Sequence, residues 1–183
     1  DVNSGDFSVS ASITRAAATN LNITTGGNNR ITLTGGGTLD ANGGNVTLTA
    51  NVAGSGGIVS GTAATDVTAN ALTLIAGSAG IGASGNPLTT NVASLVTNSD
   101  AATDGTQFLS EADSLAIGAA GLLAGGQTIT LNGGTFFINA TGSILSNVTV
   151  ENGATLGGSG AVVGTVLVNS GGTVSPGNSP GCI

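Results

Sequence analysis

The 183-residue sequence contains no histidine, lysine, tyrosine, tryptophan or methionine. Without histidine it lacks the commonest general base and metal ligand, and without lysine it has no Schiff-base nucleophile or P-loop. The two arginines, Arg15 and Arg30, are too few to form a basic surface for nucleic acid or an anionic membrane. We therefore expect a protein that is not an enzyme, has no catalytic, cofactor-binding or metal-binding residues, and has no nucleic-acid partner.

The single cysteine, Cys182, excludes an intramolecular disulfide and a cysteine-based zinc site. It also has no histidine partner for nucleophilic catalysis, so we interpret it as an incidental thiol. No apolar run approaches the ~20 residues that span a membrane as a helix, so membrane insertion is not expected. The chain opens without a basic start or an apolar run, so no signal peptide is visible, and we expect a fragment of a longer protein.

Small apolar residues, threonine and glycine fill the chain instead: 39% of residues are hydrophobic, which favours folding over disorder, and 33 are glycine. One pattern recurs, in which an asparagine or glutamine precedes alternating apolar and threonine residues and then a glycine turn. Because the alternation has a period of two, each copy predicts a strand with one buried face. The copies begin at Asn20, Asn29, Asn45, Asn70, Gln127 and Asn147.

A longer repeat near the C-terminus indicates how these strands are arranged. Residues 148–156 match residues 166–174 at an offset of 18, and a looser copy begins at Ile129. Antiparallel hairpins do not require one strand–turn–strand unit to recur at this spacing, whereas stacked coils do. The sequence therefore predicts an all-β fold, a right-handed parallel β-helix (a single-stranded β-solenoid). It should form one segment over residues 1–183 with roughly nine coils of ~20 residues.

In this arrangement Val148 stacks on Val166 and Val150 on Val168. Residues 98–126 should form less regular coils, because acidic residues gather there and a longer loop is expected. We expect strands at 108–109 and 115–117, and a short helix over 112–124 is an alternative that its three glycines disfavour. The residues expected to point inward are Ile31, Leu33, Val46, Leu48, Leu72, Leu74, Ile129, Leu131, Val148, Val150, Val166 and Val168.

Two groups of carboxylates are candidates for chemistry. Asp40 and Asp66 lie in turn sequences 26 residues apart, about one coil, and paired carboxylates hydrolyse glycosides. Few groups that would hold a substrate accompany them, so we interpret both as solvated turn aspartates. Residues 100–111 place Asp100, Asp104 and Glu111 at calcium-loop offsets. The third position is Ala102, which offers no side-chain ligand, so we expect a solvated acidic loop without a strong calcium site.

Threonine and asparagine suggest two further surfaces. The pairs Thr32/Thr34, Thr47/Thr49 and Thr128/Thr130 would form a flat ice-binding array if they aligned on one face. Their irregular spacing and the general preference of threonine for outward strand positions argue against this. Four glycosylation sequons fall mostly within the strand pattern, which explains them structurally. They lie at Asn22, Asn45, Asn139 and Asn147.

The sequence G-G-T-V-S-P-G-N-S-P-G at residues 171–181 resembles the autotransporter-associated β-strand repeat, which typically closes on S-P-G-x-S-P-G. Residues 153–160 are similar to the same repeat. Residues 71–90 resemble the filamentous-haemagglutinin class of large exoproteins. The resemblance covers most of residues 20–181 and implies a β-helical passenger, secreted by a type V route to the surface of a Gram-negative bacterium.

The resemblance thus implies a structural or adhesive segment, either a stiff stalk or a weak multivalent adhesion surface. Its partners would be its own longer chain with a translocator barrel, and host or surface glycans, proteins or neighbouring cells. A polysaccharide-acting β-helix enzyme and an ice-binding β-solenoid remain the alternatives. Neither end of the sequence resembles a capping unit, so we expect the ends to fray or self-associate.

Overall fold

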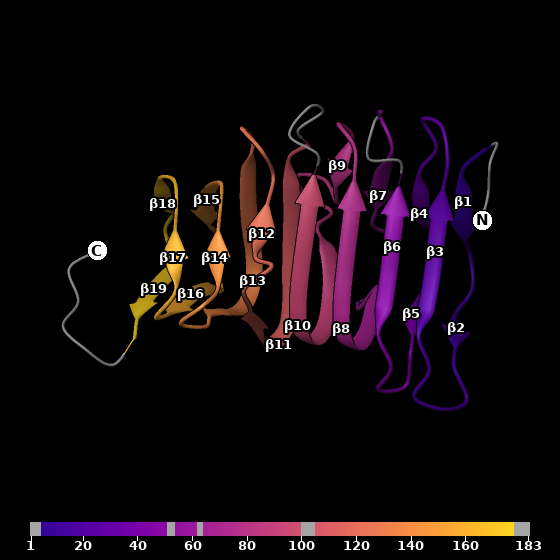
Figure 1. Ribbon diagram of the computed structural model, residues 1–183, viewed down its shortest axis with the longest axis horizontal. Helices are drawn as coiled ribbons and strands as arrows, with labels where there is room; N and C mark the ends of the chain where they lie inside the picture. The colour runs from indigo at the N-terminus through magenta and orange to yellow at the C-terminus, as the bar shows by residue number, and fades with distance from the viewer. Residues whose placement is uncertain (1–4, 51–53, 62–63, 100–104, 178–183) are drawn as a thin grey trace.

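The computed structural model describes residues 5–50, 54–61, 64–99 and 105–177, and every regular element in these ranges is a β-strand (Figure 1). Each strand pairs in parallel with strands of the neighbouring coils, so the chain forms a parallel β-solenoid. The strands are β1 (Phe7–Val9), β2 (Ile13–Thr14), β3 (Leu21–Thr25), β4 (Ile31–Leu33), β5 (Leu39–Asp40), β6 (Val46–Ala50), β7 (Gly57–Val59), β8 (Val67–Ala76), β9 (Gly80–Ile81), β10 (Leu88–Ser99), β11 (Gln107–Ile117), β12 (Leu122–Leu123), β13 (Thr128–Ile138), β14 (Ser143–Ile144), β15 (Asn147–Val150), β16 (Ala154–Gly158), β17 (Ala161–Val162), β18 (Val166–Val168) and β19 (Thr173–Pro176).

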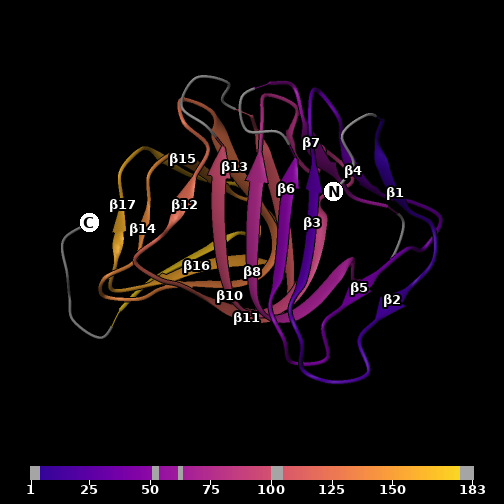
Figure 2. The same ribbon diagram turned by 45° about the vertical axis from the view of Figure 1, so that its right-hand side comes forward.

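The coil has three sides, each a ladder of strands. The first side runs through β1, β4, β7, β9, β11, β13, β15 and β18. The second begins with β2 and β5 and ends with β16 and β19, and the third begins with β3 and β6 and ends with β14 and β17. The long strands β8, β10, β11 and β13 each pair on two sides, because they continue around a corner. In Figure 2 the third-side strands β3, β6, β8 and β10 stand in front, with β13 and β15 behind them.

The number of residues per coil varies along the first side, which is why the roughly nine coils expected from the sequence are not confirmed. The successive inward residues of this side are Phe7, Ile31, Ile58, Ile81, Gln107, Ile129, Val148 and Val166, at intervals of 24, 27, 23, 26, 22, 19 and 18 residues. The 18-residue offset read from the C-terminal repeat therefore holds only there. Longer corners enlarge the N-terminal coils, so the same chain length makes fewer of them.

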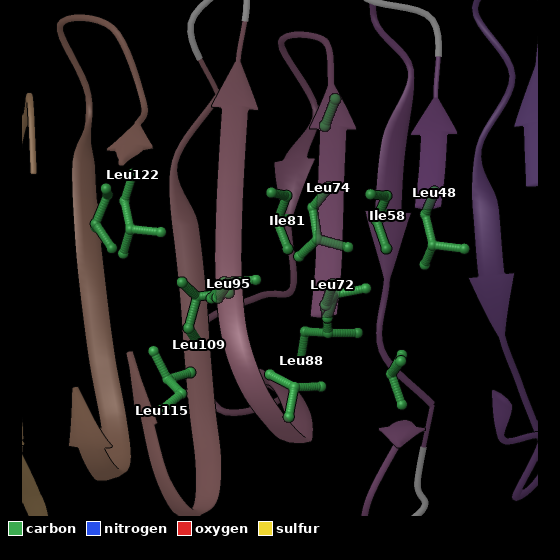
Figure 3. Close-up of a cluster of buried hydrophobic side chains, with 14 of the residues drawn as sticks. Leu48, Ile58, Leu72, Leu74, Ile81, Leu88, Leu95, Leu109, Leu115 and Leu122 are labelled. Carbon is green, nitrogen blue, oxygen red and sulfur yellow. The ribbon is translucent and has the colours of Figure 1, made fainter. Parts of the chain in front are cut away.

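The predicted inward residues form the core, except for two in the last described coil. Ten of the twelve are at most 1% exposed, and Figure 3 shows leucine and isoleucine side chains of successive coils filling the interior. Val166 and Val168 pair with Val148 and Val150 in the predicted register, yet they are 37% and 44% exposed. They belong to the last coil of the described chain, which no further described coil covers.

Residues 107–117 and 122–123 form strands rather than a helix. The expected strands at 108–109 and 115–117 are both present and belong to one strand, β11, which ends before a turn that leads into β12. The alternative helix over 112–124 is not formed. Gly121 takes a positive φ of 68° in this turn, a conformation that an α-helix does not use.

Candidate functional site

Asp66 is a fully buried carboxylate, contrary to its interpretation as a solvated turn residue. It immediately precedes β8 and is 0% exposed. Its Oδ2 accepts hydrogen bonds from the Ser60 hydroxyl at 2.7 Å and the Thr89 amide at 2.9 Å, and its Oδ1 lies 3.4 Å from the Gly61 amide. Ser60 and Gly61 belong to the same coil as Asp66, at the corner between β7 and β8, whereas Thr89 belongs to the next coil. The carboxylate therefore closes its own corner, joins it to the neighbouring coil and replaces the water it has lost.

Asp40 has different surroundings from Asp66. Leu39 pairs with Val67, so the two aspartates lie in neighbouring coils, as the spacing predicted. Asp40, however, lies opposite Thr68 and is half-buried, and its Oδ1 accepts the Asn42 amide at 2.7 Å in a local turn. Each carboxylate therefore accepts hydrogen bonds from its own donors, and these bonds give each aspartate a structural role.

Replacing Asp66 by alanine is expected to lower the free energy of unfolding by about 1–3 kcal/mol, because it leaves the buried Ser60 hydroxyl and Thr89 amide without their acceptor. Asp40→Ala, which removes one exposed turn contact, should cost less than about 1 kcal/mol. Urea denaturation of both variants measures the difference. Equal losses would show that Asp66 does not hold the coils together.

Glu111 is the second buried carboxyl group and lies within β11, not in a solvated loop. It is 3% exposed. The Val92 amide donates to its Oε1 at 3.1 Å, and the Thr90 hydroxyl lies 2.6 Å from its Oε2. Burial raises the pKa of Glu111 to about 7, and the nearby Asp113 carboxylate adds to this effect, while the two hydrogen bonds oppose it.

The Thr90 hydroxyl lies between two acceptors. Its oxygen lies 2.6 Å from Glu111 Oε2 and 3.3 Å from the Ser110 carbonyl oxygen, and it has a single hydrogen to donate. Donation to Glu111 satisfies one oxygen of the carboxyl group, and the Val92 amide satisfies the other.

This position removes Glu111 from the proposed calcium loop. Asp100 and Asp104, the other acidic members, lie outside the described residues. Within the described ranges no group of three or more histidine, cysteine, aspartate or glutamate side chains is placed to hold a metal ion. Cys182 also lies outside the described residues.

The threonine pairs fall on different faces. Thr32, Thr128 and Thr130 belong to the first side, whereas Thr47 and Thr49 belong to the third. Thr130 is moreover only 8% exposed. Along the third side, the outward row that contains Thr47 reads Asn22, Thr47, Thr73 and Val96, so no continuous threonine array forms.

The recurring asparagines connect successive coils at corners of the coil. The Asn45 amide donates to Asn20 Oδ1 at 3.2 Å, and Asn70 Nδ2 donates to Asn45 Oδ1 at 3.3 Å. The sequon residues Asn22, Asn45, Asn139 and Asn147 are all exposed, and Asn147 accepts from the Thr165 amide and hydroxyl at 3.0 Å. Asparagine therefore has a structural role at two corners, before the third side and before the first side, as its position in the repeat indicated.

An apolar hollow of about 340 Å³ opens at the C-terminal end of the rod. Its lining is apolar side chains and glycines, without a charged group: the side chains are Ile138, Leu156, Val162, Val166, Val174 and Pro176. A lining of this kind suits contact with apolar groups, and the residues that form it carry no acid or base. The sequence did not predict this hollow, although the lack of a capping unit near residue 183 was a signal for it.

Comparison with protein-family models matched none, and searches of the curated proteins and of the solved structures found no match. In the described part of the chain there is no helix that is both long and apolar enough to cross a membrane.

Proposed function

We propose that this chain is a structural and adhesive segment of a surface-displayed or secreted bacterial protein of the autotransporter type. The observation that carries the proposal is the continuous ladder of eight first-side strands, whose interior is filled by aliphatic side chains. Such stacking makes a stiff rod. The resemblance of residues 71–90, 153–160 and 171–181 to exoprotein repeats is the reason for proposing an extracellular location on a Gram-negative cell.

The mechanism is mechanical rather than catalytic. The candidate carboxylates Asp66 and Glu111 are buried and hydrogen-bonded inside the coil, and the outer faces carry small polar side chains. Flat faces of this kind suit weak contacts with glycans or proteins, which sum to firm attachment when many copies act together. The longer parent chain and its translocator barrel are the other partners in this proposal.

We further propose that the coil is right-handed. Connections between parallel strands take this hand in about 98% of sheets. In Figure 1 the strands β3, β6, β8 and β10 run upward at the front while the chain advances from right to left, which supports the same sense.

Deleting residues 5–177 from the full-length parent displayed on cells is expected to reduce attachment to a glycan- or protein-coated surface, because the reach or contact area of the passenger falls. Deleting one coil, residues 148–165, should largely preserve attachment, since Val166 then takes the place of Val148 in the ladder. Deleting the half-coil 148–156 should impair it, because the inward row is lost.

Surface labelling of the parent supplies the control for expression and display. Unchanged attachment after loss of residues 5–177, at equal display, would remove both the stalk and the adhesive roles. Hydrolysis of a polysaccharide by the purified chain, abolished by Asp40→Ala or Asp66→Ala, would instead support the enzyme alternative.

A further inference from the structure

Asparagine precedes glycine at three places in the sequence, at Asn42, Asn132 and Asn152. In this dipeptide the backbone attacks the asparagine side chain most easily, because glycine has no Cβ to hinder the approach of its own amide nitrogen. The reaction still requires that this nitrogen is free and that the local backbone can rotate. The three places differ in both respects, although their sequences are alike.

Asn42 and Gly43 are the two central residues of an exposed turn between β5 and β6. The Gly44 amide donates to the Ala41 carbonyl at 2.9 Å, which closes the turn. Both central residues have positive φ, 48° at Asn42 and 84° at Gly43, as in a type I′ turn. Among the described residues, neither the Gly43 amide nor the Asn42 side chain has a hydrogen-bond partner. Both reacting groups are therefore free and exposed.

Asn152 and Gly153 form a turn of the same length, but the amide of its glycine is occupied. The Ala154 amide donates to the Glu151 carbonyl at 3.0 Å, which matches the bond that closes the first turn. The Gly153 amide, in contrast, donates to the Gly171 carbonyl of the next coil at 3.1 Å. This bond has to break before the nitrogen can attack the Asn152 side chain.

Asn132 and Gly133 lie inside a strand rather than in a turn. Both belong to β13, and Gly133 pairs with Ser110 of β11. The Asn132 side chain is half-buried, and its Oδ1 is buried. Rotation of the backbone at this pair requires the strand to leave its ladder. Of the three pairs, the folded chain therefore leaves Asn42 and Gly43 in the position most open to reaction.

We propose that Asn42 and Gly43 are a self-modification site of the folded chain. The Gly43 nitrogen gives up its proton and bonds to Asn42 Cγ, the Cγ–Nδ2 bond breaks, and the side-chain nitrogen takes up a proton and leaves as ammonia. Water then opens the succinimide ring that has formed. Cleavage of the new bond to Cγ gives aspartate, whereas cleavage of the main-chain bond gives isoaspartate, in which the backbone runs through the former side chain. Water is the only co-reactant.

The position of the turn gives this change a local consequence, which does not depend on the proposed stalk or adhesive role. Asp40 Oδ1 accepts the Asn42 amide at 2.7 Å, so the carboxylate of either product repels a carboxylate that is already at the turn. Isoaspartate also lengthens the backbone. The turn has little room for this, because a Cβ added at Gly44 would contact the backbone of Thr19 in the preceding coil. The modification therefore loosens the corner between the second and third sides as the protein ages.

Ageing of the purified 183-residue chain at mildly alkaline pH tests the proposal. Mass spectrometry of proteolytic peptides follows the mass gain of deamidation at each of the three pairs, and electron-transfer fragmentation identifies isoaspartate. We expect Asn42 to react at least about tenfold faster than Asn132 or Asn152, because the other two pairs must first break contacts with a neighbouring coil. Circular dichroism establishes that the chain stays folded throughout.

The same chain unfolded in urea separates the effect of the fold from that of the sequence. Without the fold the three pairs should react at comparable rates. Asn42→Gly removes the side chain that is attacked, keeps a residue that accepts the positive φ, and should abolish the fast reaction of the folded chain. Comparable rates at the three pairs in the folded chain would overturn the proposal. A preference for Asn42 that persists unchanged in urea would overturn it too.

Discussion

Replacing Phe136 by alanine is expected to lower the free energy of unfolding by about 3–5 kcal/mol. Phe136 is 0% exposed and is among the largest buried side chains of the chain. It pairs with Leu115 in one neighbouring coil and Leu156 in the next, both buried, so its removal opens a cavity between three successive coils. Urea denaturation monitored by circular dichroism measures the loss.

The adjacent Phe137 provides a matched control. It has the same side chain on the same strand but points outward and is 47% exposed, opposite Ala116 and Gly157. Phe137→Ala should therefore cost less than about 1 kcal/mol. Similar losses of stability for the two variants would mean that Phe136 and Phe137 do not point to opposite faces of β13 as described.

Stability is expected to fall as the pH rises from about 4.5 to about 7, through the titration of Glu111. Its pKa in the folded protein is raised from 4.5 to about 7. Between these values the unfolded chain has released the proton while the folded chain retains it, so increasing pH favours unfolding. The free energy of unfolding falls by about 3 kcal/mol in total. The loss is complete above pH 7 and absent below pH 4.5.

Glu111→Gln isolates this contribution. Because glutamine does not titrate, the variant should lack the decline, and its stability relative to the unaltered chain should increase from pH 4.5 to 7. Asp113→Asn is the control, since Asp113 lies on the same strand but is exposed, and it should retain most of the decline. Parallel pH curves for the unaltered chain and Glu111→Gln would show that Glu111 titrates at its ordinary value.

The fold could be predicted because two simple regularities determine it. Alternation of apolar and threonine residues placed Ile31 and Leu33 inside, and the 18-residue repeat placed Val148 beside Val166. The number of coils could not be obtained in the same way, because corner length varies. A corner contributes no alternation, so the longer N-terminal coils leave no periodic signal.

The buried carboxylates were missed because an isolated charge normally predicts a solvent-exposed position. For Glu111 a signal was present: it continues the inward phase of Gln107 and Leu109 along β11. The burial of Asp66 had no such signal, since its partners Ser60 and Thr89 come from a corner of its own coil and from the next coil. Only the three-dimensional register brings these groups together.

The central claim is that the chain is a rod whose ends are separated by stacked coils. Spin labels at Ser8→Cys and Leu167→Cys, in a Cys182→Ser background diluted with unlabelled chain, test it by one pulsed electron-spin distance. Both positions point outward from the first side, with seven ladder steps between them, so we expect a distance of about 34 Å. A distance below about 20 Å would place the two ends side by side and contradict the solenoid.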